Sequence, residues 1–99
     1  MRLSDYEVRA ILEASREAFG DDAVVRLFGS RVDDTARGGD IDLHVTIPDR
    51  EGWAMKRAKF LAGMWMRMGE RKIDVVVHLP DEPDRPVDKV AQRDGVVLH

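Results

Sequence analysis

The chain has 99 residues, of which 43% are hydrophobic and 35% are charged, and its formal net charge is −3. This length predicts one domain, residues 1–99, and the negative net charge argues against direct binding of nucleic acid, which needs a basic surface. The absence of cysteine excludes disulfides and thiolate zinc sites, and no apolar run is long enough for a membrane span or a signal sequence, so we expect a cytoplasmic protein.

The first half of the chain predicts a helix followed by two strands. Ser4 and Glu7 form a capping box, which predicts a helix that starts there and ends at Gly20. Ala23 to Phe28 is short and partly β-branched, as in a strand. A polar loop, Arg31 to Gly39, precedes Asp40 to Ile47, where apolar and polar residues alternate. This alternation predicts a strand with one buried face and one polar face.

The second half predicts a helix, a strand, a shorter helix and a C-terminal tail. Apolar residues recur at helical spacing between Arg50 and Met68, and Lys72 to His78 alternates as a second strand. Arg85 to Asp94 predicts a short helix with Pro86 in its first turn. Val96 to Leu98 then forms a tail or an edge strand. The order of elements predicts an α/β (α+β) fold with helices on one face of a sheet and an open acidic face on the other.

Three aspartates carry the functional prediction. Asp40 and Asp42 lie two residues apart on a strand and therefore point to the same side of the sheet. Asp74 lies on the corresponding face of the next predicted strand, so the three carboxylates meet if these strands are neighbours. Crowded carboxylates repel one another, and Mg²⁺ relieves the repulsion because it prefers oxygen ligands. One or two Mg²⁺ ions held there fit metal-assisted chemistry on a nucleoside triphosphate (NTP).

A glycine–serine turn and an Asp-x-Asp strand together identify a known pattern. Gly29-Ser30, nine intervening residues and Asp40-Ile41-Asp42-Leu43 resemble the signature of the polymerase beta-like nucleotidyltransferase superfamily. The wider stretch from Leu27 to Leu43, the third acid Asp74 and the C-terminal Asp94 to Leu98 resemble the minimal nucleotidyltransferases of that superfamily. Gly39, where relatives often have serine, and a loop about one residue shorter than is typical depart from the pattern without removing a metal ligand.

The resemblance implies a mixed sheet and a site at the glycine–serine turn. It implies Asp40, Asp42 and Asp74 as catalytic and Mg²⁺-binding residues and Gly29, Ser30 and Arg31 as nucleotide-binding residues. The implied reaction transfers a nucleoside monophosphate from an NTP, with ATP as the default, to a hydroxyl acceptor. Minimal members commonly pair with a helical HEPN protein, which can be a toxin that the nucleotidyltransferase neutralises by adding AMP to a tyrosine.

Two functional readings follow, and some residues remain open between a structural and a functional role. The first reading is an active enzyme whose cleft is completed by a HEPN-type partner or a second subunit, because the chain has no room for an acceptor-binding domain. The alternative is a catalytically silent module that neutralises such a partner by binding it. His44 and His78 are interpreted as partly exposed strand residues, and the alternative is that they position the acceptor or relay a proton. Trp53, Trp65 and Met66 do not fit one helical stripe, which leaves either ordinary packing or an exposed partner surface.

Overall fold

The computed structural model describes residues 3–29 and 40–99, which form three helices and a four-stranded sheet. The elements in chain order are α1 (Asp5–Phe19), β1 (Val24–Phe28), β2 (Ile41–Thr46), α2 (Trp53–Met68), β3 (Ile73–His78), α3 (Pro86–Asp94) and β4 (Val96–Val97). The predicted elements are confirmed, with boundaries that differ by a few residues. The predicted loop Arg31 to Gly39 lies outside the described residues. No helix in the described ranges is long and apolar enough to cross a membrane.

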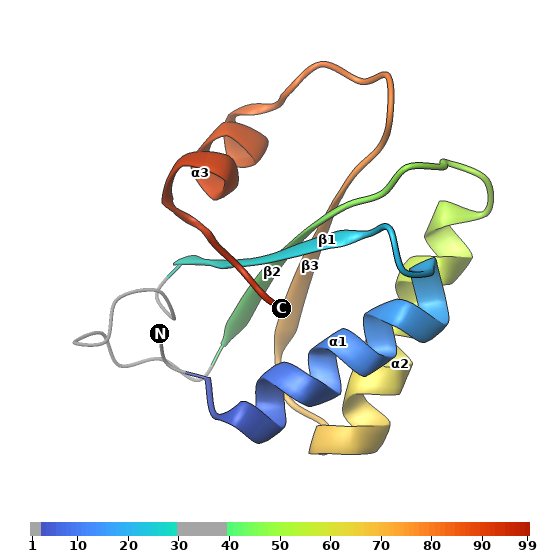
Figure 1. Cartoon of the computed structure of the whole chain (residues 1–99), viewed down its shortest axis with the longest axis vertical. Coiled ribbons are helices and arrows are strands. Elements are labelled where there is room, and N and C mark those ends of the chain that lie inside the picture. Colours follow the sequence, from blue (N-terminus) through green and yellow to red (C-terminus); the bar gives the residue numbers. More distant parts are fainter. Residues whose placement is uncertain (1–2, 30–39) are drawn as a thin grey trace.

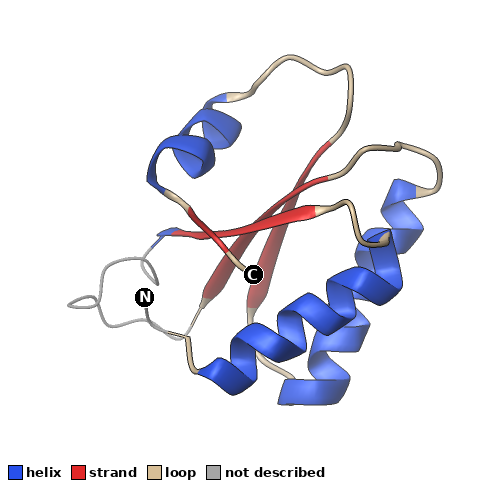
Figure 2. Ribbon diagram, viewed as in Figure 1, coloured by secondary structure: helices blue, strands red, loops and turns tan. Residues whose placement is uncertain are grey.

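The sheet has the strand order β3-β2-β1-β4 and is mixed (Figure 2). β2 and β3 are parallel and are joined by α2, whereas β1 pairs antiparallel with both β2 and β4. Arginine side chains cover the free side of the edge strand β3. Arg57 Nε donates to the Val75 carbonyl at 3.0 Å, and Arg85 Nη2 donates to the Val77 carbonyl at 2.8 Å. Because these carbonyls are already bonded, this edge is a poor template for pairing with another strand.

α1 and α2 pack together over one face of the sheet and enclose the core. α1 begins with the predicted capping box, in which the Ser4 hydroxyl accepts from the Glu7 N–H and the Glu7 side chain accepts from the Ser4 N–H. The two helices approach closely at Gly63, where an added Cβ would lie 3.2 Å from Ala14 Cβ. The core beneath them contains the inward-facing strand residues together with residues of both helices, chiefly Ile11, Leu27, Ile41, Leu43, Val45, Phe60, Met64, Ile73 and Val75. This confirms the predicted inward faces of β2 and β3.

α3 lies on the opposite face of the sheet from α1 and α2 (Figure 1). Its Asp88 reaches His44, whose side chain points away from the buried residues Leu43 and Val45. The prediction that the helices share one face is therefore wrong for α3. Within residues 3–29 and 40–99, no helix covers the polar face near the start of β2 and β3, where the predicted acidic residues lie.

Candidate active site

The register of β2 and β3 places Asp42 directly beside Asp74. The two residues are Cα partners in the parallel ladder, and adjacent strands lie about 4.8 Å apart. Ile41 and Ile73, which precede them, are buried under α1 and α2. Successive side chains on a strand alternate, so both carboxylates point to the other face. Asp42 and Asp74 therefore lie side by side on the polar face of the sheet, as the sequence predicts.

The neighbouring charges have a visible effect on Asp42. Burial raises the pKa of the Asp42 carboxyl, and the adjacent Asp74 and then Asp40 raise it further, while Lys72 acts in the opposite direction. Asp74 contributes both charge repulsion and a hydrogen bond to Asp42. A divalent cation bound here would remove the repulsion, and oxygen donors are those that Mg²⁺ prefers. The residues present therefore fit the implied Mg²⁺ site.

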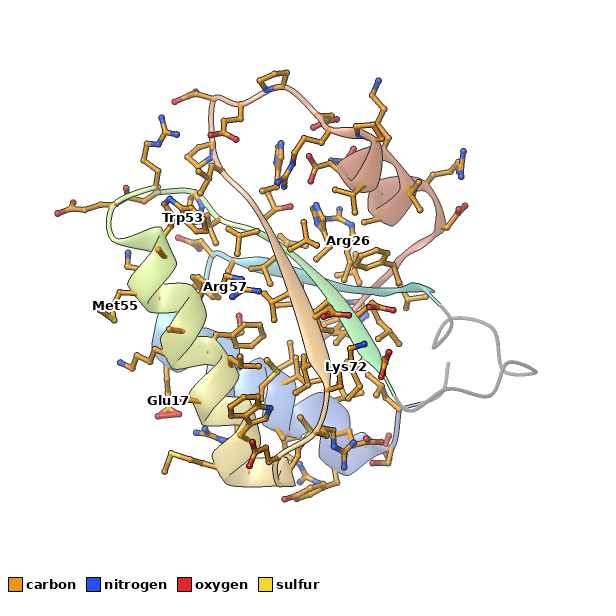
Figure 3. The ribbon with its side chains drawn as sticks, turned by 180° about the vertical axis from the view of Figure 1, so that it is seen from behind. Glu17, Arg26, Trp53, Met55, Arg57 and Lys72 are labelled. Carbon is orange, nitrogen blue, oxygen red and sulfur yellow. The ribbon has the colours of Figure 1, made fainter. Side chains whose placement is uncertain are left out.

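Asp40 lies at the border of this acidic group. It immediately precedes β2, and its Oδ2 forms an ion pair with Lys72 Nζ at 3.4 Å. Figure 3 shows Lys72 at the end of β3 where this strand begins. The ligand atoms of Asp40, Asp42 and Asp74 do not all lie within 4.8 Å of one another, and Asp40 is paired with Lys72. An ion bound at Asp40 would therefore compete with the ion pair between Asp40 and Lys72.

Gly29 brings the backbone after β1 against the same acids. Its φ of 76° is in the left-handed region, and a Cβ built on it would lie 2.4 Å from Asp42 Oδ2. A side chain at this position would collide with the carboxylate, so glycine is required for the close approach. Ser30 and Arg31, the other predicted nucleotide-binding residues, lie outside the described residues.

A second polar cluster occupies the covered part of this face. Asp88 is fully buried and accepts four hydrogen bonds, one from His44 Nε2 at 2.7 Å and three from the backbone and side chain of Arg85. Burial alone would raise the pKa of Asp88, but the hydrogen bonds from Arg85 and His44 outweigh it and hold that pKa well below its usual range. The ionised carboxylate thus fixes His44 as the tautomer with its proton on Nε2.

This cluster corrects the interpretation of His44 as a partly exposed residue, whereas His78 is partly exposed as expected. His44 has no solvent exposure, and its ring stacks near that of His78, with 6.2 Å between the centroids. The sequence analysis missed Asp88 and Arg85. The burial of Asp88 was predictable from its position three residues before Ala91, because residues three apart lie on the same side of a helix. Both residues are buried on α3.

The second cluster also resembles a metal site by distance. Potential ligand atoms of His78, Asp84 and Asp88 all lie within 4.8 Å of one another. However, Asp88 already uses its lone pairs on Arg85 and His44, and a histidine is a poor ligand for Mg²⁺. The hydrogen bonding of Asp88 therefore explains this group without a metal, whereas Lys72 only partly offsets the burial and repulsion that raise the pKa of Asp42.

Comparison with known proteins agrees with this geometry. The sequence profile of the family described as "Nucleotidyltransferase domain" matches residues 8–96, which includes all three predicted acids and Gly29. Among curated proteins, none matches the chain. The match covers most of the sequence, so the chain belongs to the nucleotidyltransferase domain family, whose members are transferases that typically use Mg²⁺ and an NTP.

Proposed function

We propose that this chain transfers a nucleoside monophosphate, AMP from ATP by default, to a hydroxyl acceptor. The observation that carries the proposal is the pairing of Asp42 with Asp74, together with the raised pKa of Asp42. A pure binding surface has no use for carboxylates that destabilise one another, whereas a metal-dependent phosphoryl transfer depends on them.

In the proposed reaction, the acceptor oxygen attacks the α-phosphorus of the NTP. The bond from this phosphorus to the bridging oxygen breaks, and pyrophosphate leaves. Asp74, which is exposed beside Asp42, takes the hydroxyl proton, while Asp40 and Asp42 would hold the metal. Bound Mg²⁺ would supply positive charge to the phosphate oxygens as the transition state forms. The backbone at Gly29 approaches Asp42 closely enough to position the phosphates beside the acids, and Ser30 and Arg31 are proposed to assist it.

We further propose that the acceptor is a tyrosine on a helical HEPN-type toxin, so that the chain acts as an antitoxin. The resemblance to minimal nucleotidyltransferases supports this partner. A surface on α2 offers a place for a partner, since Met55 and Met66 are 77% and 86% exposed. Trp65, in contrast, packs against the core, and its Nε1 donates to the Arg71 carbonyl.

The exposed α2 surface also keeps the alternative of a catalytically silent binding module. A module of this kind needs an apolar surface that protein partners can cover, and exposed methionines are frequent on such surfaces. In this case the chain neutralises the partner by covering it, and the acidic residues are dispensable for neutralisation.

Incubation with labelled ATP, Mg²⁺ and the protein encoded next to this chain separates these functions. Transfer of label to the partner that disappears in Asp42→Ala, and persists in the control Asp94→Ala, supports the enzyme. Asp94 is a suitable control because it is exposed on α3 and, among the residues that the structure describes, pairs with Arg93. Neutralisation of the toxin that survives Asp40→Ala and Asp42→Ala, with no label on the partner, would replace the enzyme by the binding module.

A further inference from the structure

Arg26 lies on the same face of the sheet as the acids, on the opposite side of β2 from Asp74. Its neighbours in β1, Val25 and Leu27, are buried under α1 and α2, so the Arg26 side chain points to the acidic face. Arg26 is the partner of His44 in the β1–β2 ladder, which makes Asp42 its diagonal neighbour, with about 7–8 Å between such positions. Figure 3 shows Arg26 on this face, between the sheet and α3.

Arg26 is a half-buried residue, yet its guanidinium makes no hydrogen bond or ion pair within the described residues. Other half-buried arginines of this protein have clear partners, as Arg57 has in Val75 and Arg71 has in Glu7. Removing a guanidinium from water without a partner costs free energy, and an unpaired cation beside a candidate site suits an anionic ligand. Arg26 is therefore available for a ligand that the acids alone would repel.

Lys72 is the second cation of this face and lies on the other side of the acids. It is located two residues before Asp74, its side chain is 69% exposed, and its only partner within the described residues is Asp40. Lys72 also counteracts the rise in the pKa of Asp42, which places its charge within electrostatic range of the acid pair. An exposed ion pair of this kind contributes little stability, so Lys72 can exchange its partner at small cost.

The charge of the complete site identifies the ligand of these two residues. Three carboxylates and a triphosphate carry more negative charge than one or two divalent ions can offset, so further cations are needed beside the phosphates. The arginine fork matches phosphate oxygens with two parallel hydrogen bonds, and a lysine binds them as a point charge.

We propose that Arg26 and Lys72 bind the phosphate oxygens of the incoming NTP from the β1 and β3 sides of the acids. This inference rests on the proposed function and adds two binding residues to it. It also links two steps of binding. When Lys72 moves from Asp40 to a phosphate, the ion pair that competes with metal binding at Asp40 is broken, and Asp40 and Asp42 would hold the metal. Nucleotide binding thus favours metal binding, because the phosphate draws the Lys72 cation away from Asp40. Metal binding favours nucleotide binding in turn, because the ion offsets the negative charge of the acids that repels the phosphates.

The test is a calorimetric titration of Arg26→Gln and Lys72→Gln with Mg²⁺ and the non-hydrolysable α,β-methylene analogues of the four common NTPs. Each variant should bind the analogue preferred by the wild type about tenfold more weakly or worse, as expected for the loss of a charge-assisted hydrogen bond. Its affinity should also depend less steeply on salt. The matched controls Arg9→Gln and Lys59→Gln remove exposed charges on α1 and α2 and should bind within about twofold of the wild type.

Binding of Mn²⁺ without nucleotide, followed by electron paramagnetic resonance, separates a binding role from structural damage. Lys72→Gln should bind Mn²⁺ as tightly as the wild type or more tightly, because it removes a cation that competes for Asp40. Should Arg26→Gln fail to fold, Arg26→Lys keeps the charge without the fork, and its affinity for the NTP analogue should still fall.

The outcomes distinguish this inference from the proposed function. If the wild type binds an NTP analogue and both glutamine variants bind it equally well, the two cations do not bind the triphosphate and only this inference fails. Unchanged affinity for the NTP together with lost transfer of label would assign the cations to the acceptor, which also overturns it. If the wild type binds none of the four analogues in the presence of Mg²⁺, both the inference and the proposed nucleotidyl transfer fail.

Discussion

Gly29→Ala tests whether the close approach of Gly29 to Asp42 shapes the metal site. The new Cβ would lie 2.4 Å from Asp42 Oδ2, which is closer than a Cβ atom approaches another atom, and 3.1 Å from Asp42 Cγ, which is a tight contact. The Asp42 carboxylate is the end of a short side chain, so it can turn away and the fold can persist. Alanine at a φ of 76° adds a backbone cost of about 1–2 kcal/mol.

The expected result is a large loss of metal binding with a modest loss of stability. Displacing a group that orients a metal ligand typically weakens binding of the ion about 10–100-fold. We therefore expect Mn²⁺ binding to weaken by this factor, measured by electron paramagnetic resonance, while urea unfolding reports a loss of about 1–2 kcal/mol.

Gly69→Ala is the matched control for this experiment. Gly69 has a φ of 85°, but no atom lies within 4 Å of the position that its Cβ would occupy. The control should lose similar stability and keep wild-type affinity for Mn²⁺. If Gly29→Ala binds Mn²⁺ as tightly as Gly69→Ala, the contact between Gly29 and Asp42 does not shape the site and the reasoning is refuted.

Three further predictions concern the charges on the polar face. Burial and Asp74 raise the pKa of Asp42, so the ionised carboxylate destabilises the fold above that pKa. Asp42→Asn should therefore raise the urea midpoint of unfolding at pH 7 without metal. This gain in stability should vanish as the pH falls through the Asp42 pKa. Asp88→Ala should lose about 3–5 kcal/mol of unfolding free energy, because it leaves His44 and Arg85 without their buried acceptor. The control Asp94→Ala removes an exposed carboxylate and should lose less than about 1 kcal/mol. A loss as small as this in Asp88→Ala would contradict the reasoning. Because folding lowers the pKa of Asp88, this carboxylate stabilises the fold fully above its pKa in the unfolded chain, about 3.9, and the stabilisation is lost as the pH falls below that value. The unfolding free energy of Asp88→Asn should therefore fall less steeply with decreasing pH than that of the wild type. An equally steep fall would exclude Asp88 as a cause of acid sensitivity.

Local patterns in the sequence were sufficient to predict the elements and the faces of the strands. The capping box at Ser4, the alternation in β2 and β3 and the proline at the start of α3 depend on neighbours within a few residues, so they are readable without the fold. Alternation also fixed that Asp42 and Asp74 point away from the core, because side chains on a strand repeat every second residue.

The partners of the polar residues depended on the path of α3. His44 has the same place in the alternating pattern as Asp42, yet it is buried against Asp88 because α3 crosses that part of the sheet. Nothing in the period of the strand indicates where a distant helix will lie. For the same reason, the sequence did not reveal that Arg26 faces the site without a partner in the described residues, or that Arg57 and Arg85 protect the edge of β3.

The sequence by itself determined the helices and strands, the polar side of each strand and the acidic residues of the candidate site, because these follow from short-range periodicity and from residue chemistry. Only the tertiary structure decided that β2 and β3 are parallel neighbours with Asp42 opposite Asp74. Strand order and register are set by the packing of α1 and α2 against the whole sheet, an interaction between residues far apart in the chain.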